Sequence, residues 1–411
     1  MENKDYWFLL KSHTYVAFQK EEILLYNTQN GNYITITNKD IISLVEEVYV
    51  PENLGVVHLK GELIRHEEFR EIIMRLISLQ IGELIDKESL QKKPIVLIPL
   101  LHLQKDVERL KGKKEISAFI GKNTLSYLLE LNIYINNTCL NKCTYCHSYN
   151  KQFTCCTSSN VEKELPIQGI ESLLKQIRHS GICRINILGG NIYQYAQLKK
   201  MVTMLESYKE LLHVYIHYKN YVKNEHIHLL KHELIITFPI DETVFQKALC
   251  CLKEKEDTTW NFVVENEAQY SDCEEIVTKY EIKDYFIFPH FTGSNLDFFR
   301  ENIYVEEEDI LGKTVQMREI FRNQKLNSNN FGKLHVFPDG TIKANVNSTV
   351  LGNIKTDSIL NIIYKEMLEN TSWRKVRDQE PCDRCVCQYL CPPLSNYELT
   401  IGKTNLCHMK P

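Results

Sequence analysis

The sequence predicts an α/β protein whose centre is an open, partial (βα)6 barrel. From Leu131 onward, short apolar runs alternate with amphipathic helical patterns, as repeated βα units do. Strands joined in this way lie parallel in one sheet with right-handed crossovers. The expected strands are Leu131–Ile135, Cys183–Leu188, His213–Ile216, Leu234–Phe238, Trp260–Val264 and Tyr285–Phe288, with helices at Ile167–Ile177, Leu198–Tyr208, Glu242–Leu252 and Tyr270–Tyr280.

The chain of 411 residues is long enough for more than one hydrophobic core. Residues 1–92 predict a small winged-helix-like module, with strands at Tyr15–Gln19, Ile23–Tyr26 and Tyr33–Thr37 and helices at Ile41–Val48 and Glu67–Leu84. We expect residues 93–125 to form a bridge, residues 126–300 the barrel and residues 301–411 a cysteine-rich extension.

The composition is that of a globular protein without a bias toward a polyanionic or membrane partner. Apolar residues make up 43% of the chain, charged residues 25%, and the net charge is −4. The N-terminus lacks the pattern of a signal peptide, and the apolar stretch Ile95–Leu103 is too short to span a bilayer. We therefore expect a cytoplasmic protein, in which 14 cysteines favour metal or cluster binding over disulfides.

Three cysteines follow the first barrel strand at spacing C-x3-C-x2-C, namely Cys139, Cys143 and Cys146. Barrels carry their active residues at the carboxyl ends of strands, which is where this loop lies. Three thiolates on one loop can hold a four-iron cluster and leave one iron open to a small molecule. Two alternatives are a zinc site with His147 as fourth ligand and packing cysteines without any ligand.

This loop, with the aromatic Tyr145 before its third cysteine, resembles that of the radical S-adenosylmethionine (SAM) enzymes. The resemblance implies a TIM-like partial barrel and a 4Fe-4S cluster that chelates SAM at its open iron. A reductant such as flavodoxin or ferredoxin would then supply the electron that splits SAM to a 5′-deoxyadenosyl radical. Gly189 and Gly190, after the second strand, match the pair that holds the methionine part of SAM. Asn191 replaces the usual glutamate, so its amide would accept the ammonium hydrogen bond without charge assistance.

Other strand ends offer weaker candidates. Asp241 follows the fourth strand and is expected to contact SAM, while Lys219, Asn220 and Glu265 are either contacts of the same kind or ordinary loop residues. No side chain is assigned a catalytic role. The cysteines without metal-like spacing are expected to be free thiols, and these are Cys155, Cys156, Cys250, Cys251 and Cys273.

A second group of cysteines lies near the end of the chain, and its spacing alone allows zinc or iron–sulfur. With the hairpin around Pro338-Asp339-Gly340 and the phrase Leu351-Gly352-Asn353-Ile354, it resembles the SPASM domain of radical SAM peptide maturases. The resemblance assigns one auxiliary 4Fe-4S cluster, the outer one, to Cys382, Cys385, Cys391 and Cys407. Ser395 and Ala344-Asn345 stand where the inner auxiliary cluster would have ligands, so we expect two clusters in all. Cys387 has no place in the pattern.

The N-terminal module resembles the domain that recognises the leader of a ribosomally synthesised peptide (RiPP) by adding it as a strand to a sheet edge. The alternative is a module that merely packs on the barrel. The sequence thus indicates a radical SAM enzyme that crosslinks or oxidises a precursor peptide. The phrases Cys391–Glu398 and Asn405–Cys407 are similar to those of a Bacteroidales-type radical SAM and pseudo-radical-SAM group. The second reading is therefore a non-catalytic partner that presents the peptide to a sister maturase.

Overall fold

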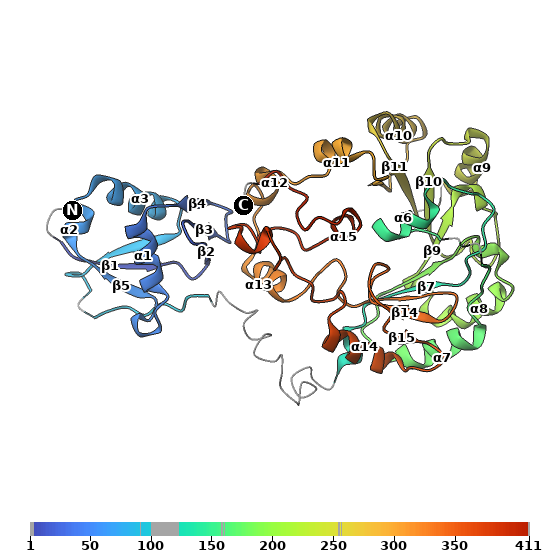
Figure 1. The fold of residues 1–411 in the computed structure, drawn as a ribbon, viewed down its shortest axis with the longest axis horizontal. Helices are drawn as coiled ribbons and strands as arrows, with labels where there is room; N and C mark the ends of the chain where they lie inside the picture. Colours follow the sequence, from blue (N-terminus) through green and yellow to red (C-terminus); the bar gives the residue numbers. More distant parts are fainter. Residues whose placement is uncertain are drawn as a thin grey trace.

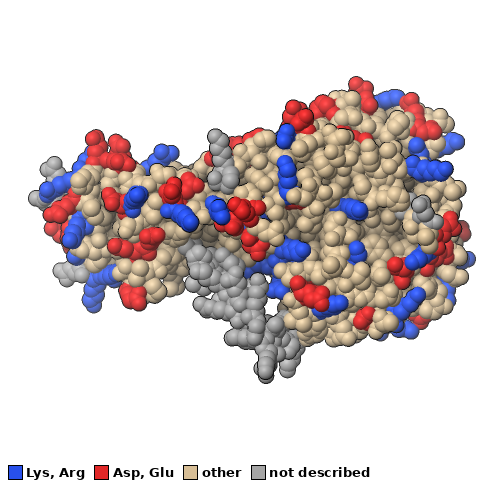
Figure 2. Space-filling view, viewed as in Figure 1, with Lys and Arg blue, Asp and Glu red and all other residues tan. Residues whose placement is uncertain are grey.

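A computed structural model describes residues 4–409 except residues 91, 100–122, 158, 160, 254 and 256. The bridge expected at residues 93–125 lies mostly outside this part. The described chain is a mixed α/β structure with one large, mostly parallel sheet (Figure 1). Acidic and basic side chains are interspersed over the visible face (Figure 2), in keeping with the small net charge. Within the described residues, no helix combines the length and the apolar composition needed to cross a membrane.

The large sheet confirms all six expected barrel strands. Within the described residues its order is β12-β11-β10-β9-β8-β7-β13-β14-β15, and the strands from β7 to β12 are parallel neighbours in chain order. Closure into a partial barrel stays a prediction. The six strands are β7 (Glu130–Tyr134), β8 (Arg184–Leu188), β9 (Leu212–His217), β10 (Lys231–Thr237), β11 (Thr258–Val264) and β12 (Tyr285–Pro289).

The C-terminal hairpin extends the same sheet, which the sequence did not indicate. Strand β13 (Lys333–Val336) pairs in parallel with β7, and β14 (Thr341–Lys343) and β15 (Gly352–Asn353) follow as antiparallel strands. The C-terminal extension therefore lies directly beside the strand that carries the first cysteine loop.

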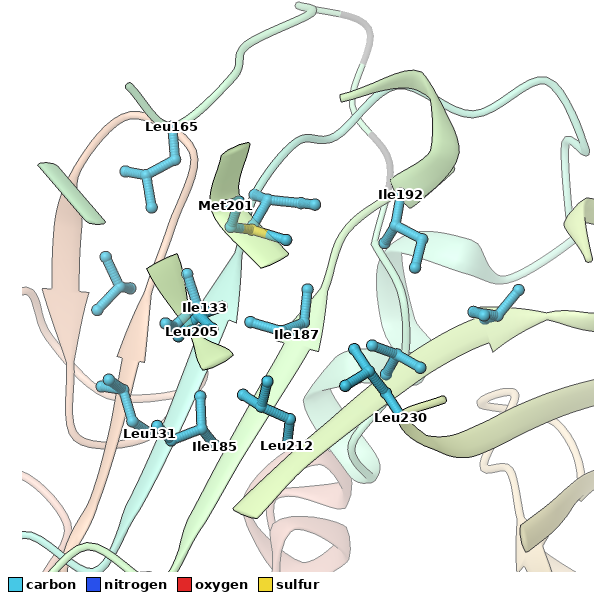
Figure 3. Close-up of a cluster of buried hydrophobic side chains, with 14 of the residues drawn as sticks. Leu131, Ile133, Leu165, Ile185, Ile187, Ile192, Met201, Leu205, Leu212 and Leu230 are labelled. Carbon is cyan, nitrogen blue, oxygen red and sulfur yellow. The ribbon is translucent and has the colours of Figure 1, made fainter. Parts of the chain in front are cut away.

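One face of the sheet is covered by helices because their apolar sides match the alternate residues of the strands. Leu131, Ile133, Ile185 and Ile187 point the same way from β7 and β8 toward Met201 of α8 (Figure 3). Helices α7 (Ile167–Ile177), α8 (Leu198–Met204), α9 (Glu242–Leu252) and α10 (Glu267–Tyr280) contribute to this core. Helix α6 (Cys146–Gln152) packs in a separate apolar cluster, and α11 (Leu296–Asn302) follows β12.

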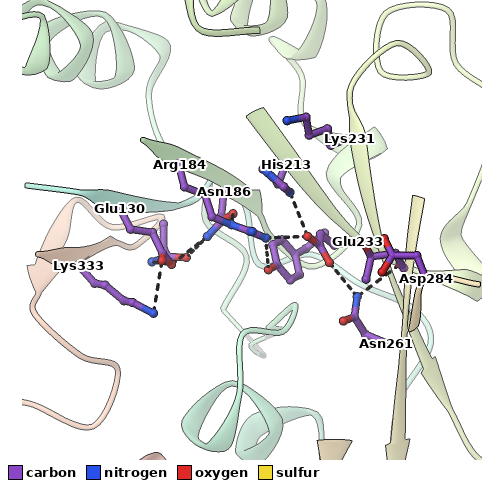
Figure 4. Close-up of polar contacts among 12 residues, drawn as sticks. Glu130, Arg184, Asn186, His213, Lys231, Glu233, Asn261, Asp284 and Lys333 are labelled. Atoms are coloured by element: carbon purple, nitrogen blue, oxygen red, sulfur yellow. Dashed lines mark hydrogen bonds and ion pairs between the residues drawn. The ribbon is translucent and has the colours of Figure 1, made fainter. Parts of the chain in front are cut away.

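The other face carries a polar network near the amino ends of the strands (Figure 4). Glu233 of β10 accepts from Arg184 at 2.6 Å, and from His213 and Asn261 at 3.0 Å each. Burial alone would raise the pKa of Glu233, but these donors hold that pKa below its usual range. Asn186 donates to Glu130 at 3.0 Å. Buried groups satisfied in this way form a fixed floor beneath the carboxyl ends of the strands.

The N-terminal module contains two three-stranded sheets, in the orders β5-β1-β6 and β2-β3-β4. The three expected strands are confirmed as β2 (Thr14–Phe18), β3 (Ile23–Asn27) and β4 (Tyr33–Ile36), whereas β1 (Tyr6–Leu10) and β5 (Val56–Leu59) were not expected. The helices are α1 (Lys39–Val48), α2 (Gly61–Ile64) and α3 (Glu67–Ser78).

The helix expected at Glu67–Leu84 was too long. It ends at Ser78, Gln80 adopts a positive φ of 58°, and Gly82–Asp86 form strand β6 against β1. A left-handed residue breaks the helical hydrogen bonds, and no local pattern in the sequence marked that break.

The module packs on the C-terminal extension. Apolar residues of β2 and β3 share one core with Ile310, Leu311 and Ile320, which come from α12 (Glu307–Leu311) and α13 (Met317–Lys325). Figure 1 shows these two helices between the module and the large sheet. Tyr26 Oη donates to the Lys313 carbonyl at 2.7 Å and accepts from the Val315 amide at 2.8 Å. The extension also contains α14 (Ile359–Glu369) and α15 (Asn396–Ile401).

Candidate functional site

The loops after β7 and β8 are held together at the carboxyl edge of the sheet. Asn136 accepts from the Gly190 amide at 3.0 Å and donates to the Asn191 carbonyl at 2.8 Å. The Asn191 amide donates to the Thr138 carbonyl at 2.5 Å. A Cβ on Gly189 or Gly190 would collide with Asn136 or Thr138, so the glycine pair is needed for its contact with the cysteine loop itself.

The three cysteines of the first loop lie in one neighbourhood. Cys139 and Cys143 are half-buried, and Cys146 is buried at the start of α6. Burial, together with the nearby thiols of Cys156, Cys146 and Cys139, raises the pKa of the Cys143 thiol to about 12. Thiols that disfavour each other's charge become good ligands when a metal supplies the opposing positive charge.

A fourth thiol, Cys156, belongs to this neighbourhood although the sequence analysis treated it as a free thiol. Cys155 and Cys156 are buried, with their sulfur atoms 3.8 Å apart, in an apolar cluster against which Cys143 and Tyr145 pack. The Thr157 amide donates to the Gly189 carbonyl at 3.0 Å and so fixes this segment beside the glycine pair. The only signal in the sequence was a cysteine pair close behind the triad.

The end of β9 brings nitrogen atoms to the sulfur atoms of the loop. Asn220 Nδ2 lies 3.4 Å from Cys139 Sγ, and its side-chain oxygen accepts from Asn141 at 2.9 Å. His217 Nε2 lies 3.4 Å from Cys143 Sγ, and burial lowers the pKa of His217 to about 3. Asn220 was a strand-end candidate, whereas His217 was missed because the expected strand stopped one residue earlier.

Helix α6 crosses from the end of β7 to the end of β12. Ser148 Oγ lies 2.7 Å from His290 Nε2, and Gln152 exchanges hydrogen bonds of 2.9 and 2.7 Å with the Phe291 backbone. Tyr145 packs on the His290 ring at 5.0 Å between centroids. Glu265 reaches the opposite side of His290, at 3.4 Å from Nδ1. Glu265, one of the strand-end candidates, therefore contacts the histidine that in turn contacts Ser148 of α6.

Two predicted SAM contacts have local structural roles. Asp241 caps α9 by accepting from the Val244 amide at 3.1 Å, and Asn191 caps a short 3-10 helix by accepting from the Tyr193 amide at 3.1 Å. Among the described residues, no hydrogen bond joins Asp241 to the cysteine loop, whereas the Asn191 backbone binds that loop directly. Their roles toward SAM stay predictions, as does that of Tyr145.

The C-terminal cysteines surround a buried ion pair. Arg377 Nη1 lies 2.7 Å from Glu398 and 3.8 Å from Cys382 Sγ. Burial raises the pKa of Cys391 to about 12, and the neighbours that act on it include Arg377, Cys382 and Cys407. Burial also raises the pKa of Cys382, where Cys407 and Cys385 add to the rise. Of the four thiols expected to hold the outer cluster, Cys382 thus has the other three as neighbours.

Cys387 lies beside this group, between Cys385 and the N-terminal module. A hydrogen bond from Cys387 lowers the pKa of Cys385 to about 7. Its side chain is buried in the core that the module shares with the C-terminal extension. This position gives the spare cysteine of the sequence pattern a packing role.

Ser395 and Asn345, at two positions where the sequence resemblance predicts no inner-cluster ligand, belong to polar networks. Ser395 forms a capping box with Glu398 at the start of α15. Asn345 donates to Asn396 at 2.7 Å and to Asn330 at 2.9 Å, and it is buried. Asn345 and Ser395 are therefore both engaged in hydrogen bonds of their own.

The donor chemistry of both cysteine groups fits thiolate-bound clusters, because each gathers three or four thiols with few competing carboxylates. Among the described residues, no group of three or more Cys, His, Asp or Glu side chains is arranged to hold a metal ion as it stands. Metal binding commonly draws deprotonated ligands together and releases their protons.

Comparisons with known proteins show a loose structural likeness. No protein-family model matches the chain, and no curated protein matches it. It is similar to Streptococcus suis SuiB bound to the precursor peptide SuiA, with a TM-score of 0.49, 15% identity and coverage of 98% of this chain and 99% of that one. For SuiB bound to S-adenosylmethionine the TM-score is 0.46 and the identity 14%, with coverage of 98% of this chain and 99% of that one. For SuiB alone the TM-score is 0.42 and the identity 12%, with coverage of 98% and 100%. At such scores and identities the likeness decides nothing about the function of this chain.

Proposed function

We propose that the chain is a radical SAM enzyme that crosslinks or oxidises a ribosomally synthesised precursor peptide. The observation that carries this proposal is the cysteine triad after the first strand of a parallel sheet, on a loop whose residues Asn136 and Thr138 are hydrogen-bonded to the glycine loop after the second strand. The C-terminal phrases that resemble the Bacteroidales-type group support the narrower assignment. When bound, a four-iron cluster and SAM would supply the radical chemistry for hydrogen abstraction.

In this proposal the chain's own residues bind the clusters, adjust their reduction potentials and exclude water. Cys139, Cys143 and Cys146 would hold the first cluster, and Cys382, Cys385, Cys391 and Cys407 the outer one. Asn220, with its amide 3.4 Å from Cys139 Sγ, donates toward a ligand sulfur, and such bonds tune a reduction potential. The aromatic rings of Tyr149 and Phe153 exclude water below the loop.

A groove on the N-terminal module supports a peptide substrate. Strand β4 pairs with β3 on one side, and along its other edge runs a groove of about 950 Å³. The groove is lined by residues 33–37 of β4 and its extension and by Glu68, Ile72 and Arg75 of α3. An unpaired strand edge offers amide and carbonyl groups to an added strand, as leader recognition by β-augmentation requires.

A second candidate function is a non-catalytic partner that presents the peptide to a sister maturase. Two observations favour it: Cys156 stands near the triad as a fourth thiol, and the Asn191 side chain is already used as a cap. A fourth thiolate would close the open iron that SAM needs.

Iron counting and nucleoside analysis separate the two functions. Three full-length proteins are reconstituted anaerobically: the native chain, a variant with Cys139, Cys143 and Cys146 changed to Ala, and a control with the exposed Cys183, Cys250 and Cys251 changed to Ala. Two four-iron clusters predict about eight irons in the native chain and the control, and about four in the triad variant. With dithionite and SAM, only the native chain and the control should form 5′-deoxyadenosine.

Two other outcomes would contradict the enzymatic function. Iron content unchanged by the triad substitutions, or zinc without nucleoside in the native chain, would remove the enzymatic function and leave the partner function.

A further inference from the structure

A hollow of about 510 Å³ lies beside the cysteine loop, where α6 faces the turn between β13 and β14. Its lining includes His147, Asn150 and Lys151 on the α6 side and Phe337, Asp339 and Lys343 on the hairpin side. His147 directly follows Cys146, so a molecule in this hollow would be next to the proposed radical site. The volume is that of sites for small organic ligands or side chains of a peptide.

The hollow is positively charged. Three lysines line it, Lys151, Lys163 and Lys343, against one carboxylate, Asp339. Asp339 is engaged locally, since its Oδ1 accepts from the Thr341 hydroxyl at 2.7 Å and the Thr341 amide at 3.0 Å. Lys163 Nζ lies 3.9 Å from Asp339 Oδ2, with both side chains well exposed, and such a pair is weak.

The other two lysines have no carboxylate partner among the described residues. Lys343 Nζ donates to the Val346 carbonyl at 3.3 Å and lies 5.8 Å from the Phe337 ring centre, which holds its ammonium at the hollow. The Lys151 backbone is fixed because its carbonyl accepts from Asn347 at 2.7 Å and Thr400 at 3.3 Å. A cation held before a ligand arrives, as that of Lys343 is, loses less conformational entropy on binding.

We propose that this hollow binds the carboxylate side chains of an acidic segment in the peptide substrate, which rests on the proposed function only in taking the substrate to be a peptide. Lysine ammoniums are point charges, and the lining has no arginine to form the planar fork that suits phosphate. Val161, Phe337, Pro338 and Val346 add apolar contacts for the rest of the segment. The substrate would therefore carry aspartate or glutamate close to the modified residue.

The test compares two matched peptides on full-length, anaerobically reconstituted protein by fluorescence anisotropy. The probe is a short labelled peptide with several glutamates, and its counterpart has glutamine at each of those positions. The proteins are the native chain, a double variant Lys151→Gln with Lys343→Gln, and a control with Lys199→Gln and Lys200→Gln. The control removes the same charge from exposed positions of α8.

We expect the glutamate peptide to bind the native chain and the control with the same affinity and the double variant about tenfold more weakly, with the difference shrinking as salt is added. The glutamine peptide should not distinguish the three proteins. Equal binding of the glutamate peptide to the native chain and the double variant would overturn the proposal, as would its displacement by inorganic phosphate at equal concentration.

These outcomes do not depend on the radical chemistry. Failure of the proposed function would appear as missing iron or missing nucleoside in the native chain. Failure of the lysine site would leave both intact and change only the peptide comparison.

Discussion

At the scale of single residues, the end of β9 and the turn after it contact two cysteines of the first loop. His217 and Asn220 place ring and amide nitrogens 3.4 Å from Cys143 Sγ and Cys139 Sγ. Because burial holds the pKa of His217 near 3, its ring is neutral at physiological pH and adds no charge to the site. Hydrogen bonds to sulfur are therefore the means by which this loop can adjust a cluster.

A buried histidine on the neighbouring strand makes the stability of the protein depend on pH. His232 of β10 is 1% exposed, and burial, with the charge of Lys255, lowers its pKa to about 3. The unfolded chain protonates this group near its ordinary pKa of about 6.5, so the unfolded state binds more protons between these values. Stability is thus full above pH 6.5 and falls as pH falls toward 3.

We expect the free energy of unfolding of the native chain to fall by about 2 kcal/mol from pH 7 to pH 5 because of His232. The variant His232→Gln should lack that part of the fall. Urea unfolding at both pH values measures the difference. The variant His66→Gln, at an exposed position, should keep the native pH dependence. The same pH dependence in His232→Gln as in the native chain would contradict the prediction.

At the scale of elements, edge strand β4 has amides whose directions follow from its pairing. The Asn27 amide donates to the Asn32 carbonyl at 2.8 Å, which marks a hydrogen-bonded pair beside the turn. Such pairs alternate in an antiparallel ladder. The backbone amides of Ile34 and Ile36 therefore point to β3, while those of Tyr33 and Thr35 point to the groove. The free edge therefore has a defined register for an added strand.

The variant Thr35→Pro should weaken binding of the precursor peptide about tenfold while the module keeps its fold, because the proline removes an amide that β3 does not use. Thr35→Val keeps the amide and serves as the control. Calorimetry measures the affinity, and thermal melting checks the fold. A proline variant that binds as tightly as the valine variant would place the leader somewhere else.

At the scale of the whole molecule, the N-terminal module and the C-terminal extension form one packed body. Tyr26 connects them, since its hydroxyl bonds both the Lys313 carbonyl and the Val315 amide. The cysteines of the extension take part as well, because Cys387 and Cys391 belong to the shared core. Order at the C-terminal cysteines and order of the module are thus coupled.

Tyr26→Phe should loosen this junction by about 1–3 kcal/mol, because it leaves a carbonyl and an amide without their partner. Hydrogen exchange at residues 313–315 should become faster than in the native chain. Tyr6→Phe removes a hydroxyl from another largely buried tyrosine of the same module and serves as the control. An exchange rate no faster than in that control would show that the junction does not depend on Tyr26.

The parts of the fold that could be predicted were those with a local signal. The six barrel strands were found because each is a continuous apolar run between turn residues. Strand β6 was missed because residues 79–86 continue the apolar pattern of α3, and only the left-handed Gln80 separates them. The pairing of β13 with β7 joins residues about 200 positions apart, and no periodicity reports such a contact.

In the candidate site, too, some residues could be predicted from local sequence and others could not. The triad and the glycine pair follow strand ends and could be predicted from spacing. Cys156 and His290 come to the site through tertiary packing of α6, and the hollow lined by Lys151 and Lys343 exists only because the hairpin lies beside the cysteine loop. Contacts of this kind depend on the whole fold and not on any one stretch.

The docking of the module on the extension has a consequence for which peptide residue can be reached. A leader paired with β4 would have one end fixed relative to the cysteine loop, and an extended chain advances only about 3.3–3.6 Å per residue. The span between the two points then acts as a ruler that sets a minimum number of residues between leader and target. Beyond that minimum, a longer spacer dilutes the target only slowly, so position along the peptide would be chosen mainly by length.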